Sequence, residues 1–290
     1  MKKRIRRLEW LIAGYLLACW LIPAAWPLYA ANADDLIFQG ADHHYKGNLD
    51  LAVASFQQAV RLDPKNDYAH NQLGVLYAKK EKFDLAFQEF STVVSLESRN
   101  TFARLWLGIL ELRNGRLAEA FDQFTAISRL DPGNADAYYF MGAVYNFQHN
   151  PVVAIEFLKK ARDADSDEAD THFRLGKAFH NLDMHHNALL EYHRTIEIKP
   201  NHTPAINEIG WIYYNQGEFE KAEAQWKKTL SINNRDQDAP LNLAKIYNDR
   251  AWSALEAGNR QEAVACWRKA ARMDPGNKQA KYYLEKYAGK

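Results

Sequence analysis

Six glycines recur at a fixed interval of 34 residues, and this spacing is the strongest constraint on what the chain can fold into. Three more columns keep the same step: an alanine, a bulky apolar residue, and a proline, serine or asparagine. Self-similarity at a fixed period of this length is typical of repeat architectures. The sequence therefore predicts an array of repeated units. The columns comprise Gly40, Gly74, Gly108, Gly142, Gly176 and Gly210; Ala52, Ala86, Ala120, Ala154, Ala188 and Ala222; Phe56, Phe90, Phe124, Leu158, Tyr192 and Trp226; and Pro64, Ser98, Pro132, Ser166, Pro200 and Asn234.

The residues around these columns indicate two helices in each unit. Apolar residues recur at helical intervals around each glycine, as at Leu73, Gly74 and Tyr77, and mark a first helix, helix A. The residues around each alanine, such as Ala86 and Phe90, mark a second helix, helix B. Glycine in one helix and alanine in the other are small, so the two backbones can approach closely. The bulky residue then fills the gap beyond them.

Turn residues mark the ends of both helices. A left-handed backbone conformation ends many helices, and glycine adopts it at the lowest cost. Proline disfavours helix in the residue before it, so pairs such as Asp63-Pro64 are expected to stop helix B. The turn column after helix A holds glycine in four units, at Gly47, Gly115, Gly217 and Gly258, and other residues in three, at Glu81, His149 and Asp183.

In sequence order this pattern, LG…Y…G…A…F…A…P over 34 residues, resembles the tetratricopeptide repeat between residues 33 and 288. The resemblance implies an all-α fold: a right-handed superhelical solenoid of about seven helix-turn-helix units plus a C-terminal capping helix. The seventh unit is seven residues longer than the others, which lengthens its helix A to about 237–256; seven residues are nearly two turns, so the apolar stripe stays in phase. The predicted units are 33–66, 67–100, 101–134, 135–168, 169–202, 203–236 and 237–277, with a cap at 278–290.

The resemblance also implies that five positions of each helix A face a concave groove. Aromatic side chains there would fill pockets, and asparagines would donate to and accept from the backbone of a bound protein segment. The alternative is that these side chains pack only against neighbouring A helices. The family's clamp of Lys, Asn and Arg for a terminal carboxylate is missing, which argues against capture of a chaperone C-terminus. The predicted groove residues are Tyr68, Asn71, Phe102, Leu105, Ile109, Tyr139, Asn146, Phe173, His180, Asn207, Trp211 and Tyr214.

The N-terminus has the charge layout of an export signal. Five basic residues among the first ten precede an uncharged run from Trp10 to Ala33. Three fates stay open for residues 1–33: a cleaved signal peptide, an uncleaved membrane anchor, or lipidation at Cys19. Each places the rest of the chain outside the cytoplasm. We expect a protein of the cell envelope on the periplasmic side of the inner membrane.

Histidine content raises one alternative function. His180, His185, His186 and His193 could converge in the fifth unit, and imidazole binds metals and haem iron. A metal- or haem-handling assembly factor would use them, although no HExxH or Cys/His spacing accompanies them. We therefore assign no metal ligand and no cofactor. Another alternative is a self-assembling coat, in which the groove of one solenoid accepts the terminus of another.

Charge and motif content narrow the leading function. After the first ten residues the chain carries 32 basic and 35 acidic residues, a net charge of −3, which argues against nucleic acid as a partner. Cys19 and Cys266 form no CxxC and indicate no disulfide framework. Nucleophile-elbow, phosphate-loop, EF-hand and dinucleotide motifs are missing, so we expect no enzyme. The expected function is a protein-interaction scaffold or adaptor in an envelope or membrane-associated assembly, binding segments of other proteins.

Overall fold

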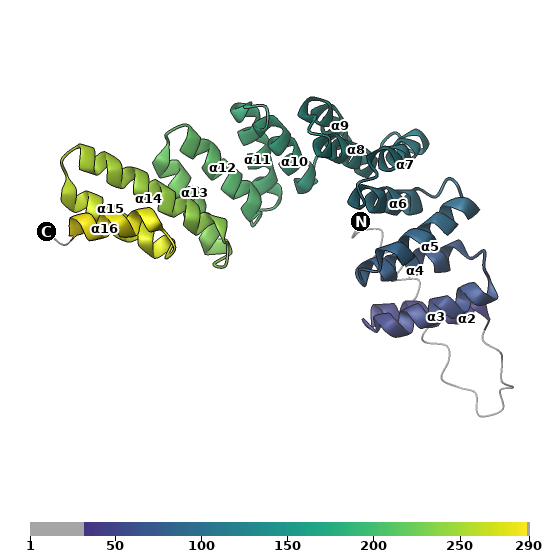
Figure 1. The fold of residues 1–290 in the computed structure, drawn as a ribbon. Coiled ribbons are helices and arrows are strands. Elements are labelled where there is room, and N and C mark those ends of the chain that lie inside the picture. The colour runs from purple at the N-terminus through teal and green to yellow at the C-terminus, as the bar shows by residue number, and fades with distance from the viewer. Residues whose placement is uncertain (1–31, 289–290) are drawn as a thin grey trace. The chain divides into compact units, whose positions relative to one another are not determined.

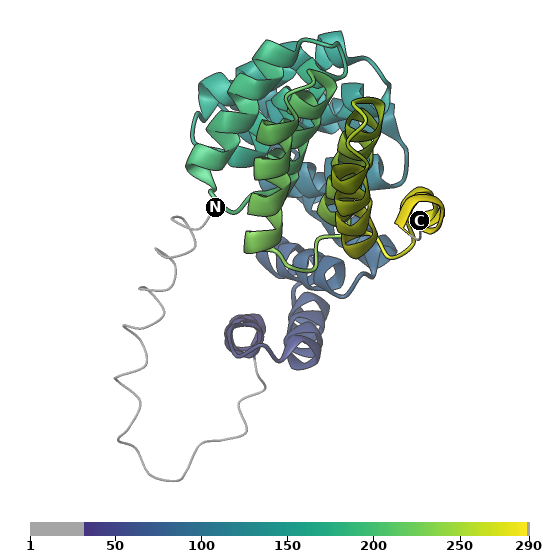
Figure 2. The ribbon, with the colours of Figure 1, turned by 90° about the vertical axis from the view of Figure 1, so that its left-hand side faces the viewer.

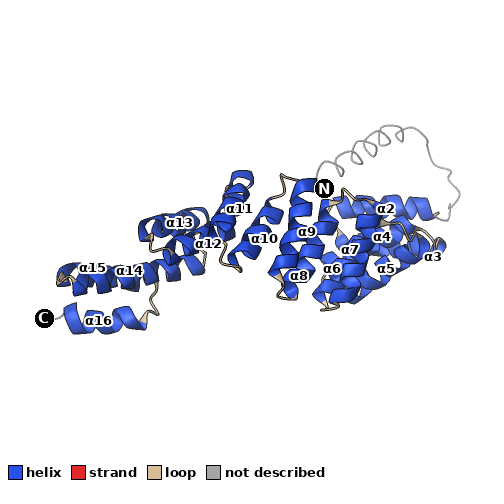
Figure 3. Ribbon diagram, turned by 90° about the horizontal axis from the view of Figure 1, so that it is seen from above, coloured by secondary structure: helices blue, strands red, loops and turns tan. Residues whose placement is uncertain are grey.

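The computed structural model describes residues 32–288, and these residues form fifteen α-helices and no strand (Figures 1 and 3). The predicted all-α fold is therefore confirmed. The chain divides into two compact parts, one ending at Leu96 and the other beginning at Glu97. None of the described helices is both long and apolar enough to cross a bilayer. The three fates predicted for the N-terminal segment concern residues 1–33, of which 1–31 lie outside the described range.

Consecutive helices pair as hairpins, two in the first part and five in the second, followed by a single last helix (Figures 1 and 2). The first part contains α2 (Ala33–Tyr45), α3 (Leu49–Leu62), α4 (Asp67–Lys79) and α5 (Phe83–Leu96). The second part contains α6 (Thr101–Arg113), α7 (Leu117–Leu130), α8 (Ala135–Phe147), α9 (Pro151–Ala164), α10 (Ala169–His180), α11 (His185–Ile198), α12 (Thr203–Asn215), α13 (Phe219–Ile232), α14 (Asp238–Glu256), α15 (Arg260–Met273) and α16 (Lys278–Ala288).

The glycine column allows the two helices of a hairpin to touch. A Cβ atom on Gly74 would lie 2.7 Å from the Phe90 ring, and one on Gly210 would lie 2.5 Å from the Trp226 ring. Each glycine thus faces the bulky residue 16 positions later on helix B. Side chains such as Phe90 and Trp226 are fully buried as a result, which confirms the predicted reason for the two columns.

The turn after helix A keeps one conformation whether or not glycine occupies it. Gly47 and the other three glycines of the column have φ between +75° and +79°. The three residues that replace glycine adopt the same left-handed region, with φ of 57° at Glu81, 54° at His149 and 56° at Asp183. Sequence departures at these turns therefore leave the turn geometry unchanged.

Asparagine caps fix where several A helices begin. The side-chain oxygens of Asn66, Asn100 and Asn134 accept hydrogen bonds from the backbone N–H three residues later, at 2.9 to 3.0 Å. Such a cap satisfies one of the backbone donors that the first turn of a helix leaves open. The sequence analysis did not single out these asparagines, although they recur with the 34-residue step.

The last hairpin has the long helix that the sequence predicted, because α14 spans 19 residues. Beyond it, α16 packs against α15 (Figure 3). Trp267 stacks on Tyr283 and Tyr287 with ring centroids 5.0 and 5.7 Å apart. The Arg260 guanidinium also donates to the Tyr287 carbonyl at 2.7 Å. These contacts hold α16 as a cap over the indole of Trp267.

Candidate partner-binding surface

The predicted groove residues all lie on A helices, the first helix of each hairpin. Tyr68 and Asn71 lie on α4, in the first part of the chain; the other ten lie on α6, α8, α10 and α12 of the second part. Their contacts divide these ten into an apolar group, a group that links successive A helices, and a group that packs inside one unit.

The two residues of α4 leave polar and aromatic surface accessible. Tyr68 is exposed and meets the Phe56 ring edge-on, with centroids 6.4 Å apart. Partial burial of its ring raises the pKa of Tyr68. The buried side-chain oxygen of Asn71 has no hydrogen-bond partner among the described residues.

Helix α6 contributes apolar surface. Phe102 is 40% exposed, and its ring meets the Trp106 ring edge-on at 6.4 Å. Leu105 and Ile109 are half-buried and rest on the core between α7 and α8, which includes Phe124. The sequence predicted these three residues of α6 together, and the structure places them along one helix beside α8.

Helix α8 extends this apolar surface at its C-terminal end. Phe147 is 61% exposed, and the neighbouring Asn146 is half-buried. We refer to Phe102, Leu105, Ile109 and Phe147 as the α6–α8 apolar face. Phe102 lies near the start of α6, and Phe147 lies at the end of the adjacent helix α8.

Tyr139, also on α8, links its helix to the next A helix. The Arg174 side chain on α10 donates through Nε to the Tyr139 hydroxyl. The same guanidinium lies 4.8 Å from the centre of the Tyr139 ring, within the range of a cation–π interaction. Tyr139 is therefore held by the neighbouring A helix.

Helix α10 carries one packed aromatic and one ion pair. The Phe173 ring lies 4.7 Å from the His202 ring and 5.8 Å from the Tyr192 ring. His180 lies 3.2 Å from the Glu208 carboxylate of α12, through Nδ1. Burial opposes ionisation of Glu208, but its contacts with His180 and a nearby lysine outweigh burial and lower the pKa of Glu208. His180 therefore contributes to the link between α10 and α12.

Asn207 on α12 has an internal structural role. Its side-chain oxygen accepts a hydrogen bond from the Thr229 hydroxyl at 2.7 Å, and its amide nitrogen lies 3.5 Å from the Asp236 carboxylate. Its backbone carbonyl also accepts from the Trp226 indole at 3.3 Å. Both ends of the Asn207 amide thus have partners within the chain.

The two aromatic residues at the end of α12 form a corner that α14 covers. Trp211 meets Tyr214 and Trp226 edge-on, with ring centroids 5.7 and 5.5 Å apart. The Lys245 ammonium lies 5.0 Å from the Trp211 ring and 4.6 Å from the Tyr214 ring. The Tyr214 hydroxyl donates to Asp249, and burial together with this carboxylate raises the pKa of Tyr214.

The sequence analysis did not predict the charged side chains that contact two of the predicted aromatic groove residues. Tyr139 with Arg174 and Tyr214 with Asp249 are each separated by 35 residues, one more than the repeat. A search for complementary side chains at this separation would have found both pairs.

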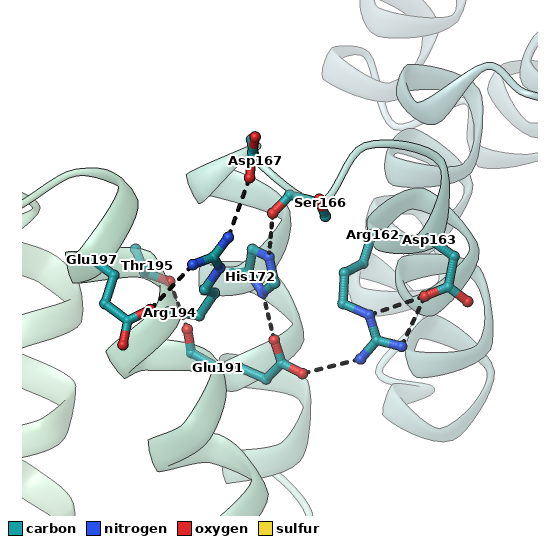
Figure 4. A network of polar contacts seen from close by, with 9 residues as sticks. All are labelled: Arg162, Asp163, Ser166, Asp167, His172, Glu191, Arg194, Thr195 and Glu197. Atoms are coloured by element: carbon teal, nitrogen blue, oxygen red, sulfur yellow. Dashed lines mark hydrogen bonds and ion pairs between the residues drawn. The ribbon is translucent and has the colours of Figure 1, made fainter.

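A polar clip between helix A and helix B is a second feature that the sequence analysis missed. His172 on α10 contacts the Glu191 carboxylate on α11 through Nδ1 at 2.6 Å and the Ser166 carbonyl through Nε2 at 3.1 Å (Figure 4). Glu191 also meets Arg162 of α9 at 3.3 Å, so one carboxylate joins three helices. The hydrogen bond that His172 donates to the Glu191 carboxylate raises the pKa of His172.

The clip recurs in two other units with the same spacings. In the first part of the chain His70 contacts Glu89 at 2.6 Å, and in the second part Arg104 donates to Gln123 at 2.8 Å. In each case the partners are 19 residues apart, and a backbone carbonyl six residues earlier accepts the second contact. The clip holds the two helices of a unit together and supports the surface without forming part of it.

Of the four histidines singled out in the fifth unit, two have rings that meet each other. His180 and His185 meet edge-on with ring centroids 5.6 Å apart, while His186 and His193 lie elsewhere along α11. Within residues 32–288, no three His, Cys, Asp or Glu side chains come together as a metal site would require. The geometry therefore gives no support to the metal- or haem-handling alternative.

Comparison with known proteins agrees with this architecture. One similar structure is the C-terminal part of a TPR repeat-containing protein from Cytophaga hutchinsonii. The match covers 84% of this chain and 98% of that one, with a TM-score of 0.69 and 19% identity. The crystal structure of MamA is 27% identical over 56% of this chain and 95% of its own, with a TM-score of 0.51. Photosystem I assembly protein Ycf3 of Prochlorococcus marinus (strain NATL1A) is 28% identical over 124 residues, which are 39% of this chain and 72% of that protein.

Family models match in four places along the chain. A TPR repeat model matches residues 40–81, and three tetratricopeptide repeat models match residues 96–135, 205–235 and 244–277. Together the matches span about half of the sequence and fall in both parts of the chain. With the glycine column, the hairpins and the left-handed turns, they show that the chain belongs to the tetratricopeptide repeat family.

Proposed function

We propose that this protein is a non-enzymatic scaffold that binds segments of partner proteins on its A helices and assists the assembly of a multiprotein complex. Two facts support the proposal. The repeat family is typical of protein–protein interaction, and the chain resembles proteins named for assembly of photosystem I. The resemblance to those relatives supports an assembly role in general, without carrying over their particular complex.

The observation that carries the proposal is the α6–α8 apolar face. Phe124 and Leu158 already fill the interiors of these two hairpins and are fully buried. The exposed rings of Phe102 and Phe147 therefore add little to the hairpin cores. Aromatic side chains that stay accessible next to half-buried aliphatic ones are typical anchors of protein interfaces.

Residues farther along the A helices would give the partner segment polar contacts. Arg174, Lys177, Glu208, Lys245 and Asp249 lie on α10, α12 and α14 and mix both signs of charge. Arg174, Glu208 and Asp249 already contact Tyr139, His180 and Tyr214, so they would offer a partner only their remaining hydrogen-bonding capacity. Such a surface selects partners by complementary charge more than by apolar burial. The proposed partner segment therefore places apolar side chains on the α6–α8 apolar face and polar ones toward α10.

Site-specific photo-crosslinking tests this surface. A photoreactive phenylalanine analogue replaces Phe147, which is 61% exposed, or Leu190 on the B helix α11, which is 63% exposed and serves as the matched control. In cells that produce the protein, Phe147 should give a discrete adduct that Leu190 does not give. The second variant, Phe102→Ala with the photoreactive group at position 147, should weaken the adduct without changing the circular dichroism. Equal adducts at both positions would contradict the proposed face.

We propose that this assembly lies in the cell envelope, on the periplasmic side of the inner membrane. Support comes from the sequence alone: the basic residues before Trp10 and the uncharged run after it. A C-terminal alkaline phosphatase fusion, active only outside the cytoplasm, tests the location. The full chain should give activity and a chain lacking residues 2–31 should give none; an inactive full-chain fusion would contradict the location.

A further inference from the structure

Charge is distributed unevenly along this chain. Residues 11–259 carry 24 basic and 32 acidic residues, a net charge of −8, whereas residues 260–290 carry eight basic and three acidic residues, a net charge of +5. The segment that contains α15 and α16 thus differs in sign from the residues before it. This contrast is independent of the apolar surface on the A helices.

The positive charge of this region is exposed. We refer to the six exposed cations of α15 and α16 as the α15–α16 basic surface. In residues 32–288 no carboxylate forms an ion pair with any of the six, whereas Lys221 and Lys227 on the neighbouring α13 each pair with a glutamate. The surface comprises Arg268, Lys269, Arg272, Lys278, Lys281 and Lys286.

The packing of α16 determines which of its side chains point outward. Its inner side is fixed by the stack of Tyr283 and Tyr287 on Trp267. Tyr282, 58% exposed, is left on the outer side. Lys278 and Lys286 lie one helical turn before and after Tyr282, so they share its side of the helix.

Solubility of a terminal cap does not explain this arrangement. Any polar surface, of either sign or of mixed sign, keeps the end of a repeat array in solution. Six unpaired cations with one exposed tyrosine among them form a more specific pattern. Lysine and arginine attract anionic headgroups, and tyrosine favours the boundary between headgroups and acyl chains.

We propose that the α15–α16 basic surface docks on the headgroups of an anionic phospholipid bilayer. The same chain carries the uncharged run from Trp10 to Ala33, which the sequence predicts to associate with a membrane. Tethering at one end raises the effective concentration of the bilayer at the other. An acidic protein could also satisfy the cations, and the membrane association predicted for the same chain is what favours the lipid surface.

Lysine protection tests the proposal in the full chain, whatever the N-terminal segment does. The protein is incorporated into phosphatidylcholine vesicles with or without phosphatidylglycerol, and amine acylation is followed by mass spectrometry. Lys278, Lys281 and Lys286 should react at least about threefold more slowly on the anionic vesicles, and 1 M NaCl should remove the difference. Lys199 and Lys228, exposed lysines elsewhere in the same part, should react equally on both. Equal rates for the three α16 lysines would overturn the proposal.

Charge-reversal variants separate docking from general attraction. In the triple variant Lys278→Glu, Lys281→Glu, Lys286→Glu, the remaining Lys269 should lose its protection on anionic vesicles. The matched triple variant Lys199→Glu, Lys227→Glu, Lys228→Glu should keep it. Persistent protection of Lys269 in the first variant would overturn docking through α16.

An acidic polymer provides the competing result. If poly-glutamate slowed acylation of the three α16 lysines while anionic vesicles did not, the surface would belong to an acidic protein and the lipid proposal would fail. The photo-crosslink at Phe147 reports the partner-binding surface separately. Failure of one proposal therefore leaves the other measurable.

Discussion

At the residue scale, the position after helix A shows how far backbone geometry can dominate residue type. All seven hairpins of the described chain place a left-handed residue there, with φ between +54° and +79°. In this region the Cβ of an L-residue approaches the following carbonyl, which costs roughly 1–2 kcal/mol relative to glycine. Hydrogen bonds of the helix end and the next helix still hold Glu81, His149 and Asp183 in it.

Reciprocal substitutions at two of these turns should have opposite effects. His149→Gly should stabilise its hairpin by about 0.5–1 kcal/mol, because relief of the left-handed strain exceeds the entropy that glycine adds to the unfolded chain. Gly115→Ala should destabilise by about 1 kcal/mol, although no atom crowds its Cβ. Urea unfolding followed by circular dichroism measures both. A lower unfolding midpoint for His149→Gly would show that the histidine side chain contributes contacts that outweigh the strain.

The glycine column gives a second prediction at this scale. A Cβ on Gly142 would lie 2.7 Å from Leu158 Cγ and 3.2 Å from the Ala154 carbonyl oxygen, and a backbone atom cannot move aside easily. Gly142→Ala should cost about 1–3 kcal/mol through overpacking. Gly133→Ala is the control, since its closest neighbour is 3.6 Å away. Hydrogen exchange of α8 and α9 should accelerate in the first variant alone; unchanged exchange would mean that the hairpin opens to accept a methyl group.

At the element scale, the polar clip couples helix pairing to pH. The hydrogen bond to Glu191 raises the pKa of His172 above its ordinary value of 6.5, so the folded state binds the proton more tightly than the unfolded chain. This stabilisation is fully present below pH 6.5 and is lost as pH rises through the higher folded pKa. His202 acts in the opposite direction, because burial lowers its pKa and favours the neutral ring.

Replacement of His172 by glutamine should therefore change the pH profile as well as the stability. Glutamine can still donate to Glu191 but does not titrate near neutrality. The stability difference between wild type and His172→Gln should be largest near pH 6 and should shrink toward pH 9, as urea titrations at each pH would show. His202→Gln provides the opposite-sign comparison. A difference that stayed constant from pH 6 to pH 9 would mean that His172 does not change protonation there.

The sequence predicted features that repeat in every unit far better than features that occur between particular pairs. Columns of Gly142-type and Leu158-type residues recur because each hairpin needs the same close contact. Arg174 and Asp249 are not recurrent, since each satisfies one neighbouring tyrosine, so a search for repeated residues passes over them. For the same reason Asn207 looked like a groove residue, although Thr229 and Asp236 occupy its amide.

At the scale of the whole molecule, stability is expected to follow nearest-neighbour contacts. The cap α16 covers the Trp267 indole. Within residues 97–288 its main packing partner is α15, the second helix of the last hairpin. Removal of α16 should therefore act locally. The last hairpin depends on α16 because the aromatic rings of Trp252 and Trp267 pack against Tyr283 of that helix.

Truncation after Asn277 tests this expectation. Loss of Tyr283 and Tyr287 should expose Trp252 and Trp267, shift tryptophan emission to longer wavelength and reduce hydrogen-exchange protection in α14 and α15. Protection in α8 and α9 should not change. Truncation after Ala288 is the control and should leave the emission unaltered. Loss of protection throughout α6–α15 would instead show that this part unfolds as one cooperative body.

The 35-residue separation of contacts between A helices also affects how this gene can change in length. A deletion of residues 169–202 would bring α12 next to α8 and place Glu208 at the position that Arg174 holds now, 34 residues earlier. A carboxylate there can accept a hydrogen bond from the Tyr139 hydroxyl, just as Asp249 accepts one from Tyr214. Loss of this particular repeat by recombination would thus leave a complementary pair at the new junction between α8 and α12.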